Sequence, residues 1–293
     1  MTHIAFIGIG TMGEPMAANL LKKGFSVTIV KRRRLEPVAR LQAIGAKVAG
    51  TPAEAAAGAS IAILSLPTSK EVNTCVIGER GLAGAMQAGS VIVDCSTSDP
   101  ASTRHLAALL ADSKIGFVDA GMTRGAAGAK QGTLAFFLGG DQAHIDQAMP
   151  ALKAMGDTFL HLGPVSHGHT AKVISNILSY ATVALVNEAL TLGVKNGVNG
   201  NKLFEALMQG APSKALETFG ARILKSEYDP PRVTVDHVCD DMTLGQALAS
   251  SGNTPIFMHG IAEALYRMLA LQGFGARDMA TIAELNRHKV LPE

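Results

Sequence analysis

The sequence has few cysteines, and neither these nor its histidines form a metal-binding pattern. The three cysteines, Cys75, Cys95 and Cys239, lie far apart and form no CxxC pair. Disulfide-stabilised folds and cysteine zinc sites need such pairs. His167 and His169 form an HxH pair, but no carboxylate or cysteine accompanies them at ligand spacing. We therefore expect no metal ion, no disulfide framework and a cytoplasmic location.

A large excess of charge of one sign is also missing. The formal net charge is +2, so the charge balance predicts neither nucleic acid nor a membrane surface as a partner. The first residues have no basic start, and glycines break their apolar run, so no signal peptide is predicted. The most apolar long stretch, about residues 170–195, carries Lys172, Asn176 and Glu188. We interpret it as a buried core helix rather than a membrane span.

What the sequence does contain is an alternation of two patterns through its first half. Short apolar segments alternate with helical segments rich in alanine and leucine, which predicts a parallel sheet with helices on both faces. Strands are predicted at residues 3–7, 26–30, 60–66, 90–96, 116–121 and 133–140. After about residue 165 only helical patterns remain. The expected fold is α/β, with one domain over residues 1–164, a long helix at about 168–195, and an all-α domain within residues 165–293.

A glycine motif directly follows the first predicted strand. Its residues are Gly8, Gly10, Thr11, Met12 and Gly13, and they open a helical segment. In a dinucleotide-binding turn the first glycine allows the tight turn, the second lets the backbone approach the pyrophosphate, and the third lets helix and strand pack closely. The phosphates then meet free N–H groups at the helix N-terminus. The alternative is a structural glycine turn, but the strand-turn-helix context favours a Rossmann-type domain that binds a dinucleotide through these residues.

The end of the second predicted strand indicates which dinucleotide is bound. NAD sites usually have an acidic residue there for the ribose hydroxyls, and NADP sites an arginine for the 2′-phosphate. The strand is followed by Lys31, Arg32 and Arg33, with no acidic residue before Glu36. This run is either a solvated basic turn or a phosphate site. Because it falls where the ribose must lie, we expect NADP(H) to be preferred over NAD(H), with Arg32 as the main phosphate ligand.

Several motifs in order give the chain a resemblance to one family over nearly its whole length. They are FIGIGTMGEPMAANL, SLPTSKEV, DCSTSDP, DAGMTRGAAGAKQGTLAFFLGGD, GHTAKVISN and YRMLALQGFGARDMATI. The sequence resembles the β-hydroxyacid dehydrogenases, which include the 3-hydroxyisobutyrate dehydrogenases and, more distantly, 6-phosphogluconate dehydrogenase. The resemblance implies hydride transfer between a nicotinamide and the hydroxyl-bearing carbon of a short acid, without a metal. It also implies a homodimer or homotetramer formed through the all-α domain.

Lys172 and Asn176 stand four residues apart, so on a helix they share one face. From spacing alone, the favoured interpretation of Lys172 is a surface lysine with its charged end in solvent. The resemblance implies instead that Lys172 is the catalytic general acid/base and that Asn176 positions the substrate. Reduction of a carbonyl builds negative charge on oxygen, which an ammonium group stabilises and protonates.

The resemblance extends to residues at the ends of three other predicted strands. It implies that Leu66, Pro67 and Thr97 contact the cofactor and that Ser96 contacts the substrate. Ser96 and Thr97 have an alternative role as caps of the following helix. The family's Ser-Gly-Gly turn, which binds the substrate carboxylate, is replaced by Thr123, Arg124 and Gly125.

One departure from the family reverses a charge. In DHVCDDMTLG, Asp240 stands where the family has a lysine, and Asp241 keeps the family's aspartate. We hypothesise that Arg124 binds the anionic end of the substrate while Asp240 faces a hydroxyl or ammonium group. Alternatively, Asp240 points into solvent.

Three functions follow from these observations. The first is an NADP(H)-dependent oxidoreductase that interconverts a short 3-hydroxy acid and its semialdehyde or oxo acid. The second is an imine reductase on the same fold, against which the retained Lys172 argues. The third is a non-catalytic NADP-binding module, against which both Lys172 and Asn176 argue.

Overall fold

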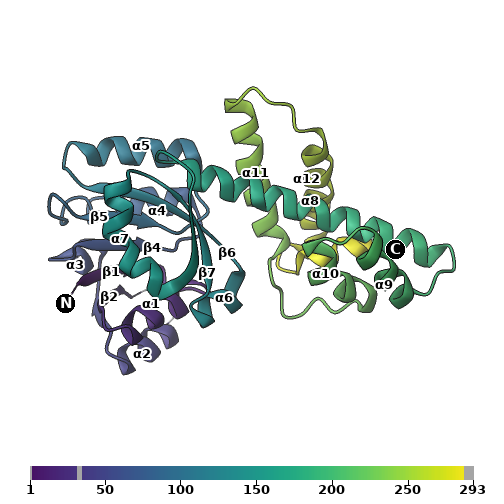
Figure 1. Cartoon of the computed structure of the whole chain (residues 1–293), viewed down its shortest axis with the longest axis horizontal. Helices are drawn as coiled ribbons and strands as arrows, with labels where there is room; N and C mark the ends of the chain where they lie inside the picture. Colours follow the sequence, from purple (N-terminus) through teal and green to yellow (C-terminus); the bar gives the residue numbers. More distant parts are fainter. Residues whose placement is uncertain (1, 32–34, 287–293) are drawn as a thin grey trace. The chain divides into compact units, whose positions relative to one another are not determined.

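The computed structural model describes residues 2–31 and 35–286. The chain forms two compact units, Met1–Lys172 and Val173–Glu293. The boundary between them lies within one long helix, α8 (His167–Lys195). In Figure 1 the sheet belongs to the purple-to-teal N-terminal unit, and the C-terminal unit is built from green and yellow helices.

The N-terminal unit is built on one eight-stranded sheet. Its strands are β1 (His3–Ile7), β2 (Ser26–Val30), β3 (Lys47–Ala49), β4 (Ile61–Leu64), β5 (Val91–Asp94), β6 (Gly116–Thr123), β7 (Leu134–Gly139) and β8 (Gly156–His161). Their spatial order is β3-β2-β1-β4-β5-β6-β7-β8. The first six strands in this order follow the dinucleotide-binding arrangement, in which the strand order reverses between β1 and β4. The predicted Rossmann-type fold is confirmed.

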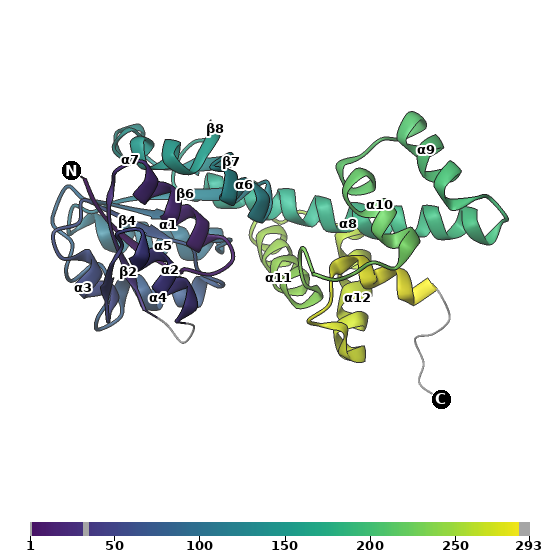
Figure 2. The same cartoon turned by 90° about the horizontal axis from the view of Figure 1, so that it is seen from below.

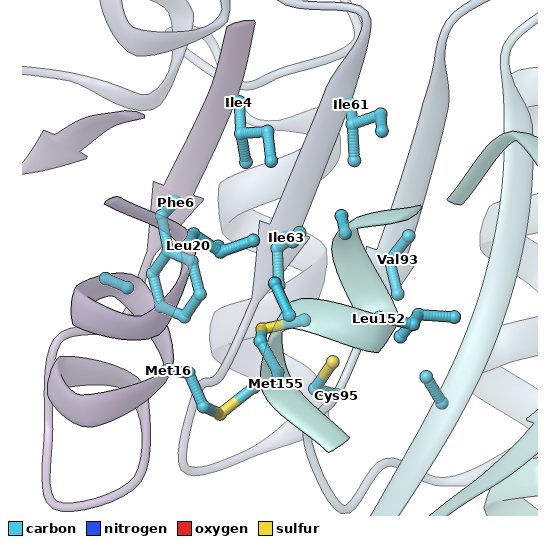
Figure 3. Packing of buried hydrophobic residues seen from close by; sticks show 14 of the residues in the cluster. Ile4, Phe6, Met16, Leu20, Ile61, Ile63, Val93, Cys95, Leu152 and Met155 are labelled. Carbon is cyan, nitrogen blue, oxygen red and sulfur yellow. The ribbon is translucent and has the colours of Figure 1, made fainter. Parts of the chain in front are cut away.

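Helices pack on both faces of this sheet. They are α1 (Gly13–Lys22), α2 (Glu36–Ala43), α3 (Pro52–Ala56), α4 (Ser69–Ile77), α5 (Pro100–Ala111), α6 (Gly125–Gln131) and α7 (Gln142–Met155). Neighbouring residues of one strand point to opposite faces, so Ile4 and Phe6 belong to one buried cluster and Ala5 and Ile7 to another. Figure 3 shows Phe6 and Ile63 packed in the cluster that also contains Met16 and Leu20 of α1 and Leu152 and Met155 of α7.

Two strands were not predicted, and one has the opposite direction to the prediction. β3 is only three residues long, and β8 contains two exposed positions at its end, as is typical of edge strands. β7 pairs antiparallel with β6. The segment between them, residues 124–133, is shorter than the dozen or so residues that a parallel crossover requires. The expectation of a wholly parallel sheet was therefore wrong at this pair.

The C-terminal unit is helical within the residues described. After the remainder of α8 it contains α9 (Gly200–Gly210), α10 (Lys214–Lys225), α11 (Val235–Ser251) and α12 (Phe257–Leu269), followed by two shorter helical segments, η1 (Ala270–Phe274) and η2 (Met279–Asn286). Figure 2 shows α9 and α10 along the C-terminal half of α8. The core of this unit includes Tyr180 and Leu190 of α8, Met242 of α11 and Tyr266 of α12. The predicted long helix and all-α region are confirmed.

Among the described residues, α8 is the one helix whose length and apolar composition would allow it to cross a membrane. A third of the residues in its most apolar window are buried within the protein. Core helices of soluble proteins meet the same two criteria, so this finding alone is weak support for a membrane segment. Val173, Val183 and Leu190 of α8 are almost fully buried.

Candidate functional site

The glycine turn has the tight geometry that a dinucleotide-binding loop requires. Gly8 has a φ of +101°, and a Cβ there would overlap the carbonyl oxygen of Ser65. A Cβ at Gly13 would overlap the carbonyl oxygen of Gly8. At Gly10, by contrast, a Cβ would meet no atom within 4 Å, and both Gly10 and Thr11 are exposed. The turn is therefore closed against the segment that follows β4 and against its own backbone, and it is open at Gly10, the side where a pyrophosphate binds.

The turn leads directly into α1, whose N-terminus is free of side-chain capping. Met12 is the N-cap residue and makes no side-chain cap hydrogen bond, but the Glu14 N–H already donates to the Gly10 carbonyl oxygen at 3.0 Å, and Pro15 has no N–H. An anion here would therefore interact with the positive end of the helix dipole and with N–H groups that precede Glu14. Glu14 in this turn would repel an anion. Arg40 of α2 binds both of its carboxylate oxygens, at 2.6 and 2.9 Å. This bidentate pair offsets the negative charge near the turn.

Buried side chains connect the carboxyl ends of β4 and β5. The hydroxyl oxygen of Ser96 accepts a hydrogen bond from the Leu66 N–H at 2.9 Å. The Asp94 carboxylate accepts from the Ser96 N–H at 2.9 Å and from the Ser98 hydroxyl at 2.7 Å. Thr97 is half-buried beside them, and Pro67 is exposed. Four predicted residues thus lie together at the carboxyl ends of these two strands: Leu66, Pro67, Ser96 and Thr97.

The alternative role of Ser96 and Thr97 as helix caps was wrong. The N-cap of α5 is Asp99, whose carboxylate accepts from the Ala101 N–H at 3.0 Å. Pro100 follows at the first helical position, where its missing N–H costs no hydrogen bond. Ser96 and Thr97 therefore belong to the loop rather than to the helix start.

The turn after β6 is held by Arg124. This residue has a φ of +77° and is followed by Gly125 at +58°, so two consecutive residues are left-handed. The Arg124 guanidinium donates to Asp157 Oδ1 at 2.5 Å, to Thr158 Oγ1 at 2.9 Å and to the Thr133 carbonyl oxygen at 2.7 Å. The Thr158 hydroxyl and then Arg124 lower the pKa of the Asp157 carboxyl. Arg124 thus ties its turn to β8, and the carboxylate of Asp157 already occupies part of its guanidinium.

Lys172 extends from the second turn of α8 and lies against β6. A Cβ at Gly121 would be 2.6 Å from the Cβ of Lys172, so the two backbones approach closely. Asp119, Gly121 and Thr123 point to the same face of β6 because side chains alternate along a strand. The half-buried Lys172 side chain and the Thr123 hydroxyl therefore share one face at the carboxyl end of this strand.

Asn176, one helical turn after Lys172, is anchored within the C-terminal unit. Its amide nitrogen donates to Asp241 Oδ2 at 2.6 Å, and the Tyr180 hydroxyl donates to the same oxygen at 2.6 Å. Burial, together with the negative charge of Asp241, raises the pKa of Tyr180 well above its usual value. The Tyr180 hydroxyl therefore stays protonated and acts as the hydrogen-bond donor. An ionised carboxylate only accepts hydrogen bonds, which fixes the orientation of the Asn176 amide. Asp240, the neighbour of Asp241, is exposed.

The basic run after β2 is described only in part. Lys31 is exposed, and its N–H donates to the Ala49 carbonyl oxygen at 3.1 Å. Arg32 and Arg33 lie outside the described residues, so their predicted role in binding a 2′-phosphate stays a prediction.

The histidines of the HxH pair serve separate purposes. His167 contacts the Leu162 carbonyl oxygen at 3.1 Å, whereas His169 is buried and bonded to Thr103 and Asp94. Within residues 2–31 and 35–286, no three or more His, Cys, Asp or Glu side chains are grouped so as to hold a metal ion.

Sequence reasoning missed the buried polar groups beneath this site. Asp94, Asp119 and His169 are at most 1% exposed, and each bonds to neighbouring loops or helices. A signal was present in the sequence, because Asp94 and Asp119 interrupt apolar strands, where a charged residue needs specific partners. The strand-end position alone did not show which partners these were.

Comparisons with known proteins agree with this fold. Residues 3–163 match the family model of the NAD binding domain of 6-phosphogluconate dehydrogenase. Residues 166–286 match that of the NAD-binding domain of NADP-dependent 3-hydroxyisobutyrate dehydrogenase. The N-terminal unit is therefore a nicotinamide dinucleotide-binding domain.

Individual relatives cover almost the whole chain. An NAD-dependent L-serine dehydrogenase of Pseudomonas aeruginosa is 34% identical and covers 97% of this chain and 98% of its own. A 2-(hydroxymethyl)glutarate dehydrogenase of Eubacterium barkeri is 33% identical, over 96% of this chain and 94% of its own. A solved structure of Mycobacterium tuberculosis 3-hydroxyisobutyrate dehydrogenase with L-serine superposes with a TM-score of 0.89 at 26% identity, covering 98% and 99% of the two chains. The chain belongs to the β-hydroxyacid dehydrogenase family.

Proposed function

We propose that this protein is an NADP(H)-dependent oxidoreductase that interconverts a short 3-hydroxy acid and its semialdehyde or oxo acid, with Lys172 as general acid/base. The observation that carries the proposal is the position of Lys172. It extends from the start of α8 against the carboxyl end of β6, on the same face as Thr123. In sheets of this kind, ligands bind at the carboxyl ends of the strands.

The residues present fit a bound dinucleotide. The open side of Gly10 and the uncapped N-terminus of α1 suit a pyrophosphate. When bound, the nicotinamide supplies or accepts the hydride. The Lys172 ammonium stabilises the negative charge that develops on the substrate oxygen and donates a proton to it, and in the oxidative direction the neutral amine accepts that proton.

The substrate class is supported by the names of the relatives and by the polar groups of this chain. Relatives are named for L-serine, 3-hydroxyisobutyrate and 2-(hydroxymethyl)glutarate, all of which carry a primary hydroxyl near a carboxylate. Thr123 supplies a hydroxyl where the family turn has serine. Asp240, in place of a family lysine, favours a substrate with a hydroxyl or ammonium group rather than a second carboxylate.

The cofactor preference is tested by Arg32→Ala. A charged hydrogen bond to a 2′-phosphate contributes about 1.5–3 kcal/mol, so the variant should lose about 10- to 100-fold in kcat/KM for NADPH. Its kcat/KM for NADH should change little, because NADH lacks that phosphate. Steady-state kinetics with both cofactors measures the ratio. A wild-type enzyme that prefers NADH, as the name of the serine dehydrogenase relative would suggest, contradicts the NADP assignment.

The role of Arg124 is tested by comparing Arg124→Ala with Asp157→Asn. If Arg124 binds the substrate carboxylate directly, Arg124→Ala raises the KM for substrate about tenfold or more, whereas Asp157→Asn leaves the KM unchanged or lowers it by releasing the guanidinium. If Arg124 acts by holding its turn to β8, both variants raise the KM. We expect the second result because the guanidinium is bonded to Asp157, Thr158 and Thr133. An unchanged KM in both variants would remove Arg124 from the site.

We also propose that the protein is a homodimer or homotetramer formed through its C-terminal unit. Exposed apolar side chains recur at helical spacing on α8, at Ile174, Leu178, Leu185 and Leu192. Such a stripe is typical of an interface. Light scattering after gel filtration should give a multimer for the wild type and for Leu109→Glu on α5, which changes an exposed leucine of the N-terminal unit. Leu185→Glu combined with Leu192→Glu should give a smaller species. A monomeric wild type would contradict the proposal.

A further inference from the structure

The first turn of α8 is fastened to the sheet by a buried hydrogen-bond network. The Asp119 carboxylate of β6 accepts from the Ser166 N–H at 2.7 Å and from the His169 N–H at 2.8 Å. A carboxylate at this position satisfies N–H groups at the helix N-terminus and interacts favourably with the helix dipole. Asp119 is fully buried, so these two hydrogen bonds take the place of bonds to water at its carboxylate.

The imidazole of His169 adds a second attachment, to different elements. Its Nδ1 lies 2.7 Å from the Thr103 hydroxyl of α5, and its Nε2 lies 3.1 Å from the Asp94 carbonyl oxygen at the end of β5. A carbonyl oxygen only accepts hydrogen bonds, so Nε2 carries a proton and donates. In the neutral ring Nδ1 then accepts from the Thr103 hydroxyl, whose single proton also lies within reach of the Asp99 carbonyl oxygen, 3.1 Å from Oγ1. The Asp94 carboxylate oxygen, 3.8 Å from Nε2, lies on the same side.

His169 therefore joins α8, α5 and β5 at the point where the loop residues Ser96 and Ser98 are also anchored. Asp94 binds both of those serine residues through its carboxylate and His169 through its carbonyl oxygen. Lys172 follows His169 by three residues, so the two side chains leave neighbouring turns of the same helix face. A displacement of the first turn would move the Cα of Lys172 by a similar amount.

We infer that His169 is a positioning residue for Lys172: its two ring hydrogen bonds fix the start of α8 on β5 and α5, and thereby set the point from which the Lys172 side chain reaches the reacting oxygen. The inference rests on the proposed catalytic role of Lys172. A displacement of about 1 Å in a catalytic group costs about 100-fold in rate, so the loss of both ring bonds should be visible in kcat.

The test compares His169→Leu, which removes both ring bonds, with His169→Gln, whose amide can both donate and accept. Each is made with Lys172 present and in Lys172→Ala supplied with ethylamine, a free amine that does not depend on the helix for its position. With Lys172 present, His169→Leu should lower kcat by about 10- to 100-fold without changing the Kd for NADPH, and His169→Gln should recover most of the loss. In Lys172→Ala, with or without the amine, His169→Leu should cause no further loss.

A second readout needs no turnover, and Thr103→Val, which removes one ring bond and keeps His169, serves if His169→Leu folds poorly. The proteins are treated with a water-soluble, amine-reactive acylating reagent, and peptide mass spectrometry measures the rate of acylation at each lysine. The acylation rate of Lys172 should change in His169→Leu and in Thr103→Val, while that of the exposed Lys153 of α7 stays constant. An equal loss of kcat in both backgrounds, or an unchanged labelling rate at Lys172, would overturn the inference and leave His169 a purely structural residue. Full activity of Lys172→Ala would instead overturn the proposed function, independently of the labelling result.

Discussion

Lys172→Ala is expected to lower kcat for carbonyl reduction by about 10²- to 10⁴-fold, the range typical for removal of a general acid. Without the ammonium group, negative charge on the substrate oxygen is stabilised only by weaker donors such as the Thr123 hydroxyl, and the proton must come from water. The Kd for NADPH should stay within about twofold, because the glycine turn and the α1 N-terminus are separate from α8. Single-turnover kinetics with excess enzyme measures the chemical step directly.

A matched control is available on the surface of the N-terminal unit. Lys153→Ala removes an exposed lysine at the end of α7 and should leave kcat and KM unchanged. If Lys172→Ala loses no more activity than Lys153→Ala, Lys172 is not the general acid. If it loses NADPH affinity in proportion to kcat, its effect is on the fold of the unit rather than on the reaction.

Gly13→Ala is expected to have the second largest effect, on cofactor binding. The added methyl overlaps the Gly8 carbonyl oxygen, which is backbone, so α1 or the turn must move. Strain of this kind typically costs about 1–3 kcal/mol. If that cost falls on the bound geometry, the Kd for NADPH rises by about 5- to 150-fold, together with a lower Tm. Calorimetric titration with NADPH and a thermal melt measure the two effects.

Gly10→Ala separates binding from folding at the same turn. Its methyl meets no protein atom within 4 Å, so the Tm should equal that of the wild type while NADPH binding weakens. Gly84→Ala, which also meets no atom within 4 Å but lies far from the turn in sequence, should change neither. Normal NADPH binding by Gly10→Ala would show that the dinucleotide does not approach this turn.

Much of the fold follows from the sequence because apolar periodicity is strong where burial is complete. Strands such as β1 and β4, buried on both faces, were predicted within a few residues. β3 and β8 lie at the edges of the sheet, where fewer positions are buried and the pattern weakens. The direction of β7 depends on the length of a connection rather than on any residue pattern, so periodicity alone did not predict it.

The candidate site was predicted unevenly, for a related reason. Dinucleotide binding requires a particular backbone geometry, so the glycine spacing alone was enough to predict Gly8 and Gly13 as residues of the turn. The roles of Lys172 and Asn176 were predicted from a family resemblance, since their spacing alone favours a surface lysine. The contacts of Arg124 with Asp157 and of His169 with Thr103 join residues far apart in the chain. Such pairings depend on the tertiary fold, which sequence spacing does not encode.

The most direct test of the proposed function is transfer of a labelled hydride. The wild-type enzyme is incubated with NADPH deuterated at C4 of the nicotinamide and with short semialdehydes, 3-oxo acids and cyclic imines. Mass spectrometry then measures the masses of the products. We predict one deuterium on the former carbonyl carbon of a short hydroxy acid, and loss of this product in Lys172→Ala. Deuterium in an amine product alone, or tight NADPH binding with no labelled product from any compound, would contradict the account and favour an imine reductase or a cofactor-binding module.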